Sequence, residues 1–294
     1  MRRRFALIGP GRLGQAVARL LVEAGLTPVA IVSRDPERAR QAARFADRPD
    51  AATTDMERVT DAKLILLTVP DDALVPVARK LHQLPLRSGT VLVHFSGYHP
   101  AEILGRDPER GIEVLALHPL QTFADSVMGV KNLPGSPISV QGSDAVLSLG
   151  IRLARALKGK PFRLEGEKKP LYHAAASVLC NHLIANTRAA CEIMAACGIE
   201  RDKAFELLKP LLTGTVRNLS ALGPEQALTG PISRGDVQTV TAHLEAMRAL
   251  PADLQAIYRV LAQKAVDIAL ERGSIDIRCA EELRRILDSD QPIA

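Results

Sequence analysis

Residues 5–25, with the sequence FALIGPGRLGQAVARLLVEAG, constrain the fold more than any other part of the chain. A short apolar run ends at Ile8, and three glycines follow it closely. Beyond the glycines, apolar side chains recur at helical spacing, with polar side chains between them. The pattern predicts a buried strand, a tight turn and an amphipathic helix that ends at a C-terminal glycine.

The glycines have the G-x-G-x-x-G spacing that binds a dinucleotide when it joins a strand to a helix. The first permits the tight turn, the second lets a pyrophosphate approach the backbone, and the third lets the helix pack closely on its strand. N–H groups at the helix start would hold the anion. The predicted cofactor contacts are Gly9, Pro10, Gly11, Arg12, Leu13 and Gly14. The alternative is an ordinary turn whose glycines serve packing only.

The end of the second predicted strand, IVSRDPERAR, favours NADP over NAD. An NAD site usually has an acid about 20 residues past the glycines, whereas an NADP site has an arginine for the 2′-phosphate. Ser33, Arg34 and Arg38 offer a hydroxyl and two guanidinium groups. Asp35 is the rival for a ribose, but Asp35-Pro36 is typical of a helix N-cap followed by the first helical residue. For Arg34, the alternative is a solvated surface charge.

Composition narrows the class of protein. The chain has 294 residues, enough for one large or two medium domains, with 47% hydrophobic and 24% charged residues. A net charge of +5, 3% aromatic residues and no tryptophan argue against nucleic-acid binding. No apolar stretch has the length of a membrane helix, and no histidine spacing indicates a metal site. The four cysteines form no C-x-x-C pair, which indicates reduced thiols. We therefore expect a cytoplasmic protein with a small-molecule substrate, no membrane partner and no metal.

Alternation of apolar and amphipathic segments predicts an α/β fold with a doubly wound parallel sheet. From Lys168 onward only helices are predicted, and they span residues 168–197, 201–212, 236–249, 251–271 and 276–288. The boundary falls near residue 165. We therefore predict a dinucleotide-binding domain over residues 1–165 and an all-α domain over residues 166–294.

Ligands of open α/β sheets lie at the carboxyl ends of the strands, and three predicted strand ends are polar. After the strand near residue 65, Val69 and Pro70 are expected to run along the cofactor, and the following Asp71-Asp72 pair to cap the next helix. Ser96 and Gly97 end another strand and can reach the nicotinamide, although Gly97 is also typical of a plain turn.

The third strand end, LHPLQTF, carries candidate substrate contacts. His118, Gln121 and Thr122 would face the same crevice, and a purely structural histidine is the alternative for His118. On the long predicted helix, His173, Ser177 and Asn181 are spaced i, i+4, i+8 and so form one polar stripe among small and apolar neighbours. Such a stripe is solvated, hydrogen-bonded within the protein or in contact with a ligand, and we interpret it as facing a ligand.

Six segments together resemble the uncharacterised Rossmann-like oxidoreductases that carry a DUF2520 C-terminal domain: GPGRLGQA, LTVPDDAL, HFSG, LHPLQTF, YHAAASVLCN and ALTGPISRGD. The chain is similar, more distantly, to pyrroline-5-carboxylate reductase and to the ketopantoate reductase and β-hydroxyacid dehydrogenase group. The resemblance implies a Rossmann domain that binds NADP, an all-helical C-terminal domain and a homodimer formed through that second domain.

The same resemblance reveals a departure in the catalytic motif. Ketopantoate reductases and β-hydroxyacid dehydrogenases have Lys-x-x-x-Asn on the long helix, with the lysine as proton donor, whereas this chain has Ser177 and Asn181 at that spacing. A serine hydroxyl is a poor general acid near neutral pH. Histidine exchanges a proton there, so His173 is the first candidate for the acid and His118 the second. Lys169, one turn further back, is a weaker candidate.

The segment LTGPISRGD lies between predicted helices and completes the list of candidate residues. Asp236 is expected to cap the helix that begins at Val237. Thr229 and Arg234 are predicted to contact a carboxylate substrate, from the other subunit of the dimer, and a plain surface turn is the alternative.

Together these features predict an NADP-dependent oxidoreductase that transfers a hydride between the nicotinamide and a small carbonyl or imine compound, carboxylated in the leading interpretation. The alternative is an NADP-binding redox sensor or regulatory protein without turnover. The absence of the lysine that serves as proton donor in the related enzymes supports this alternative.

Overall fold

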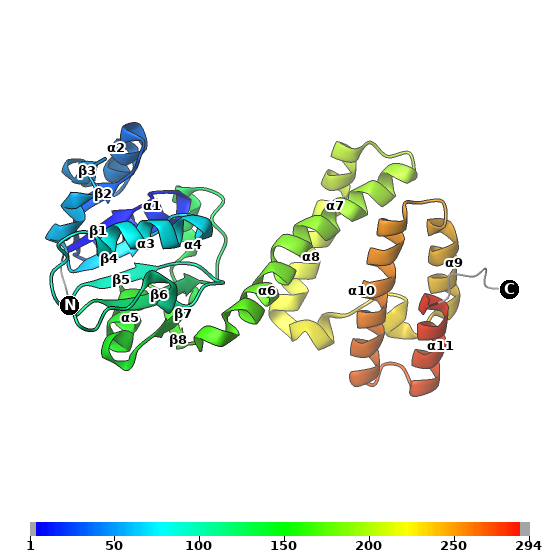
Figure 1. Cartoon of the computed structure of the whole chain (residues 1–294). Coiled ribbons are helices and arrows are strands. Elements are labelled where there is room, and N and C mark those ends of the chain that lie inside the picture. The colour runs from blue at the N-terminus through cyan, green and yellow to red at the C-terminus, as the bar shows by residue number, and fades with distance from the viewer. Residues whose placement is uncertain (1–3, 289–294) are drawn as a thin grey trace. The chain divides into compact units, whose positions relative to one another are not determined.

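The computed structural model of the chain describes residues 4–288, and its internal contacts divide it into two compact units, Met1–Cys180 and Asn181–Ala294 (Figure 1). The first unit holds the sheet, and the second is helical. The sequence predicted a boundary near residue 165, but the first unit extends through Cys180. Helix α6 (Lys169–Leu179) therefore belongs with the sheet.

The first unit is built on one eight-stranded sheet, which confirms the predicted fold class. Its strands are β1 Arg4–Ile8, β2 Thr27–Val32, β3 Ala52–Thr53, β4 Leu64–Leu67, β5 Val91–His94, β6 Glu113–Pro119, β7 Pro137–Gly142 and β8 Lys160–Arg163. Their order is β3-β2-β1-β4-β5-β6-β7-β8. The chain winds outward from β1 in one direction and then from β4 in the other, so the direction switches between β1 and β4. In sheets of this kind the ligand crevice lies at that switch, beyond the carboxyl ends of the strands.

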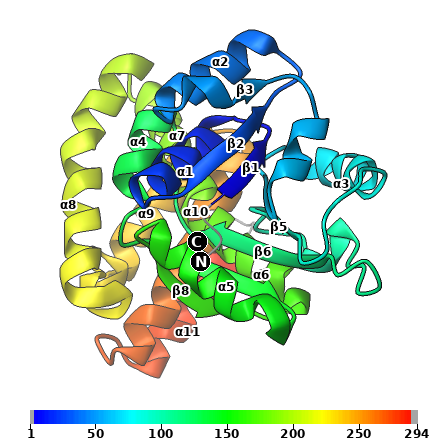
Figure 2. The ribbon, with the colours of Figure 1, turned by 90° about the vertical axis from the view of Figure 1, so that its left-hand side faces the viewer.

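Helices cover both faces of the sheet because the central strands are apolar on both sides (Figure 2). The helices of the sheet unit before α6 are α1 Arg12–Glu23, α2 Pro36–Phe45, α3 Leu74–His82, α4 Ser126–Asn132 and α5 Asp144–Ala156. Phe5 and Leu7 of β1 pack in one core with α1, α2 and α5, and the alternate residues Ala6 and Ile8 pack in a second core with α3.

One strand pair departs from the predicted parallel sheet, because β6 and β7 are antiparallel. A parallel neighbour needs a crossover that runs the length of the sheet. The connection between these two strands instead contains the short helix α4, whose Gly129 lies against Ala16 of α1. The chain therefore leaves β6 at its carboxyl end, forms α4 against α1, and begins β7 at the same end of the sheet.

The second unit comprises α7 Asn181–Ala196, α8 Arg201–Ala227, α9 Val237–Met247, α10 Ala252–Glu271 and α11 Ile277–Asp288. Helices α9, α10 and α11 share a core that includes Val240, Val266 and Leu283. Helix α8 begins where it was predicted but continues past the predicted end at residue 212 to Ala227, with a bend at Gly223. Only Ala204 of α8 is buried, so most of the apolar side chains of this helix are exposed.

The helix predicted for residues 168–197 is interrupted at Cys180, which has φ −93° and ψ −67°. Helix α6 ends before this residue and α7 begins after it. The break separates Asn181 from the unit that contains His173 and Ser177. Among residues 4–288, none of the helices combines the length and apolarity that crossing a membrane requires.

Candidate functional site

The glycine turn between β1 and α1 has the geometry that the motif requires. Gly9 has φ 82°, and a side chain there would strike Val69 at the end of β4. A side chain at Gly14 would strike the Thr68 hydroxyl, which donates a hydrogen bond to the Gly9 carbonyl at 2.8 Å. These two glycines therefore allow the turn and helix α1 to lie close against β4.

Gly11 differs from the other two glycines, because a Cβ atom built on it meets nothing within 4 Å. It is the N-cap of α1, no side chain caps this helix end, and the first turn carries no acid. The first N–H groups of a helix have no partner within the helix, and they attract anions. The start of α1 is therefore open to a pyrophosphate, so these residues fit a dinucleotide.

At the end of β2, the carboxylate that would compete for a ribose is already engaged. Asp35 caps α2 and accepts the N–H groups of Glu37 at 2.9 Å and Arg38 at 3.3 Å, as predicted. The Arg38 guanidinium also lies 3.6 Å from the carboxylate, in an exposed pair. Arg34 is exposed and has no hydrogen-bond or ion-pair partner in residues 4–288. Ser33 Oγ accepts the N–H of Asp35 at 3.2 Å.

The turn after β4 corrects one prediction, because the Asp71-Asp72 pair does not cap the next helix. A 3-10 turn over Asp71–Ala73 precedes α3, whose N-cap is Ala73, without a side-chain cap. The Asp71 carboxylate instead accepts a hydrogen bond from Ser96 Oγ at 2.9 Å. Because this turn precedes α3, Asp71 is not at the N-cap position and its side chain lies at the end of β5.

Ser96 organises the loop after β5. Its hydroxyl donates to Asp71 and accepts the N–H groups of Tyr98 at 3.1 Å and His99 at 3.0 Å. Its own N–H donates to Nδ1 of His94 at 3.1 Å. The other ring nitrogen of His94 therefore carries the hydrogen and donates to the Pro100 carbonyl at 3.1 Å. These bonds hold the backbone at Ser96 and Gly97 in one conformation.

Gly97 lies between two imidazole rings, from β6 and α6. A Cβ atom on it would collide with Nδ1 of His173 and lie 2.8 Å from Nε2 of His118. The two rings, which we call the histidine pair, have centroids 5.6 Å apart at an angle of 84°. Gly97 is therefore more than a plain turn residue, because any side chain would expel the histidine pair.

The two histidines differ in their hydrogen bonds. Nδ1 of His118 lies 3.0 Å from the Tyr172 hydroxyl, whereas Nδ1 of His173 is buried and has no hydrogen-bond partner in the described residues. An unpaired buried polar atom costs free energy, and such an atom beside a predicted ligand site is a candidate ligand contact.

Burial keeps the histidines at these strand ends uncharged. Loss of solvent lowers the pKa of His118 to about 4 and that of His94 to about 3, and the nearby Lys169 ammonium contributes to both shifts. Burial also raises the pKa of the Tyr172 hydroxyl. At neutral pH His118 is therefore a neutral imidazole and a poor general acid.

The structure brings four of the predicted residues together at the ends of β5, β6 and the start of α6: Ser96, Gly97, His118 and His173. Ser177 lies one turn further along α6 and is partly exposed. Asn181 is exposed and is the first residue of α7 in the second unit.

The remaining substrate candidates lie outside the strands and α-helices. The Gln121 amide donates to the Asn132 carbonyl at 3.3 Å and to Ser136 Oγ at 3.2 Å, and its oxygen accepts the N–H of Thr122 at 2.8 Å. Gln121 would have to leave these bonds to contact a substrate. In the second unit, Thr229 and Arg234 are exposed.

Sequence reasoning missed several residues of the site. Asp71, His94 and Tyr172 had no predicted role here, and Lys169 was a weaker candidate. The i, i+4 spacing of Lys169 and His173 was a usable signal, because it extends the polar stripe backward. The complete burial of Lys169 had no signal in the sequence.

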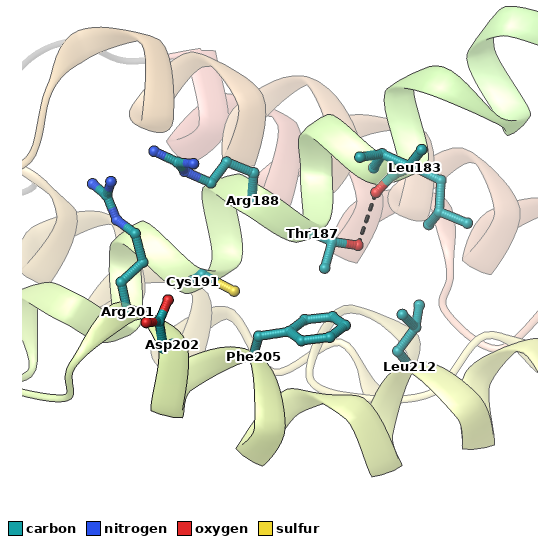
Figure 3. Close-up of a pocket in the computed structure, with 9 residues that line it drawn as sticks. Leu183, Thr187, Arg188, Cys191, Arg201, Asp202, Phe205 and Leu212 are labelled. Atoms are coloured by element: carbon teal, nitrogen blue, oxygen red, sulfur yellow. Dashed lines mark hydrogen bonds between the residues drawn. The ribbon is translucent and has the colours of Figure 1, made fainter. Parts of the chain in front are cut away.

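A separate cavity of about 650 Å³ lies in the second unit between α7 and α8 (Figure 3). Apolar side chains line much of it, among them Leu183, Phe205 and Leu212. Its two arginines, Arg188 and Arg201, lie 2.6 Å and 3.8 Å from the carboxylate of Glu192. Glu192 therefore balances the charge of the arginines at this cavity.

Two family models match the chain. Residues 1–119 match the Rossmann-like domain, and residues 136–265 match the domain of unknown function DUF2520. The chain combines a Rossmann-like domain with a DUF2520 domain. This confirms the resemblance inferred from the six segments.

Solved structures and a curated protein are similar to this chain over most of its length. A putative NADP oxidoreductase from Bacteroides fragilis is 25% identical, with a TM-score of 0.72 over 90% of this chain and 98% of that one. A protein from Thermotoga maritima is also 25% identical, with a TM-score of 0.73 over 92% and 99%. An NAD(P)+ glycerol-3-phosphate dehydrogenase from Rhizobium etli is 27% identical over 254 residues, which are 78% of this chain and 76% of the relative.

Proposed function

We propose that this protein is an NADP-dependent oxidoreductase that transfers a hydride between the nicotinamide and a small, carboxylated carbonyl or imine compound. The observation that carries the proposal is the histidine pair beside Gly97, at strand ends next to an open glycine turn. The names of the relatives support the reaction class, because they include a dehydrogenase and a putative NADP oxidoreductase.

The residues divide the work between binding and proton transfer. The start of α1 would hold the pyrophosphate, Arg34 and Arg38 the 2′-phosphate, and Val69, Pro70 and Gly97 would flank the nicotinamide. The cofactor supplies or accepts the hydride. Tyr172 would donate to Nδ1 of His118, so that Nε2 carries a hydrogen and can polarise the substrate oxygen or nitrogen without a charge.

His173 would then exchange the proton with the substrate. Its buried Nδ1 has no hydrogen-bond partner in the part of the chain that the structure describes, and it lies at Gly97 beside Nε2 of His118. In the sequence interpretation either histidine could be the acid. We now assign that role to His173 alone, because the lowered pKa of His118 leaves its ring neutral near pH 7.

The proposal is tested by single-turnover oxidation of bound NADPH against a panel of keto acids and cyclic imines. The reverse direction is tested with NADP+ and hydroxy compounds that include glycerol 3-phosphate. If the enzyme converts any of these compounds faster than the cofactor reacts in buffer without enzyme, the result supports an oxidoreductase. Tight NADPH binding with no turnover across the panel would favour the alternative, a redox sensor or regulatory protein.

Arg34→Ala is expected to weaken NADPH binding much more than NADH binding. The arginine would make a charge-assisted hydrogen bond to the 2′-phosphate, and loss of such a bond costs about 1.5–3 kcal/mol. Titration of cofactor fluorescence measures both dissociation constants. Arg40→Ala is the control, because Arg40 is an exposed arginine on the following helix, α2, and pairs with Glu37. Equal losses for both cofactors would contradict the assignment.

We also propose that the protein forms a homodimer through the second unit. Apolar side chains on α7 and α8 are strongly exposed, among them Ile184 at 68%, Leu211 at 67% and Leu222 at 57%. Large apolar side chains exposed in this number are typical of interaction surfaces. Dimerisation would remove these side chains from water.

Leu211→Glu is expected to convert the dimer to a monomer, because a buried unpaired carboxylate at an interface is costly. Sedimentation velocity measures the change. Thr213→Glu, at an exposed position on the same helix, introduces the same charge as the control. A wild-type protein that sediments as a monomer would refute the dimer.

A further inference from the structure

A fully buried lysine lies directly behind the site. Lys169 is 0% exposed, and its Nζ donates a hydrogen bond to the Ser96 carbonyl at 2.9 Å. An ammonium group has three hydrogens to donate, and burying one is costly unless it is well paired. Within residues 4–288, no carboxylate lies within ion-pair distance of it, and the charge of Asp71 acts on it from further away. A methionine would fill the same volume at less cost, so the filling of space alone does not explain a lysine here.

The position of Lys169 connects it to both imidazoles. It is the first residue of α6, whose start has no side-chain cap, and its bond to Ser96 ties this helix end to the end of β5. Tyr172 and His173 follow within the next turn. Tyr172 contacts His118, and His173 lies against Gly97, the neighbour of Ser96.

We propose that Lys169 is a positioning residue: by holding the Ser96 carbonyl, its ammonium group fixes the start of α6 so that Tyr172 and His173 meet His118 and Gly97. The inference rests on the proposed function of the histidine pair, but the arrangement itself can be tested without turnover.

Electrostatics give Lys169 a second effect on the pair. The charged and titratable groups around His118 are Lys169, Tyr172 and His173 of α6, together with His94 of β5 and Asp71 of the turn after β4. The ammonium repels a proton on His118, which adds to the effect of burial. Burial in turn lowers the pKa of Lys169 to about 8, and Asp71 opposes that shift. The charge therefore persists at neutral pH and disappears in mildly alkaline solution.

The first test is Lys169→Met, with Lys168→Met as the matched control, because Lys168 is exposed and pairs with Glu165. NMR titration of the His118 ring in the cofactor-free protein is expected to show a midpoint about one pH unit higher in Lys169→Met. The control should titrate like the wild type. We expect kcat to fall about tenfold or more, and the NADPH dissociation constant to change less than about threefold. An unchanged His118 midpoint in a folded Lys169→Met protein would overturn the proposal.

A second measurement covers the case in which Lys169→Met does not fold. In the wild type, the ring signals of His118 should show a second, smaller inflection near pH 8, where Lys169 loses its proton. Lys169→Arg, which keeps the charge, should retain the low His118 midpoint and lack that inflection. Absence of the wild-type inflection would overturn the proposal. If the wild type turns over no substrate, the function fails while the titrations still decide the role of Lys169. If the wild type turns over substrate and kcat is unaffected in a folded Lys169→Met protein, the proposal is overturned while the proposed function stands.

Discussion

Replacing His173 with alanine is expected to slow hydride transfer by about 10²–10⁴-fold, the usual contribution of a positioned acid or base. The reason is that Nδ1 of His173 is buried beside Gly97 without a partner, so it is free to exchange a proton with a substrate. Binding of NADPH should change little, because the residues proposed to hold its phosphates, at the glycine turn and at Arg34, are unchanged. Stopped-flow absorbance of bound NADPH measures the step.

Two further variants sharpen this experiment. His118→Ala is expected to reduce the rate by a smaller factor, because a neutral imidazole contributes a hydrogen bond rather than a proton. His182→Ala is the control, since His182 is exposed in the second unit. If His173→Ala and His118→Ala both keep the wild-type rate, the histidine pair is not the catalytic group.

Acidification from about pH 6.5 to pH 4 is expected to destabilise the folded state strongly. The pKa of His118 is lowered to about 4 and that of His94 to about 3, whereas both take up a proton near pH 6.5 when unfolded. In this window the unfolded chain binds more protons than the folded one, so stability falls as pH falls. Each histidine contributes a slope of about 1.4 kcal/mol per pH unit, and the two together about 2.7 kcal/mol per pH unit.

Urea unfolding between pH 7 and pH 4.5 measures this slope, and substitution separates the histidines from the carboxylates that also titrate there. His118→Gln should reduce the slope, because one of the two groups no longer titrates. His94→Asn keeps an acceptor for the Ser96 N–H and should act in the same way if it folds. His182→Ala should leave the slope unchanged. The same slope in all four proteins would show that neither buried histidine governs acid stability.

The sequence was sufficient to predict the glycine turn and the start of α2, because both depend on local rules. The glycine spacing, the helical period after it and the Asp35-Pro36 cap each concern residues within a few positions of one another. In the structure, Gly9 has a positive φ, Gly14 packs closely against Thr68, and Asp35 caps α2, as the sequence predicted. Alternation of strands and helices was likewise enough to predict the layered sheet, although not the antiparallel pairing of β7.

The predictions at the strand ends were only partly successful, because they concern where side chains point. His118 and His173 do meet, but Asp71 bonds Ser96 instead of capping α3. The predicted helix over residues 168–197 is instead two helices, α6 and α7, with Cys180 between them.

What the amino-acid order determined by itself was therefore the glycine turn, the cap of α2 and the class of fold, because each follows from backbone preferences of neighbouring residues. Only the tertiary structure decided that Gly97 lies between two imidazoles, that His118 loses its charge and that Lys169 is buried behind them. These properties depend on burial and on contacts between β5, β6 and α6. Because residues far apart along the chain form these contacts and exclude the solvent, no local sequence pattern predicts them.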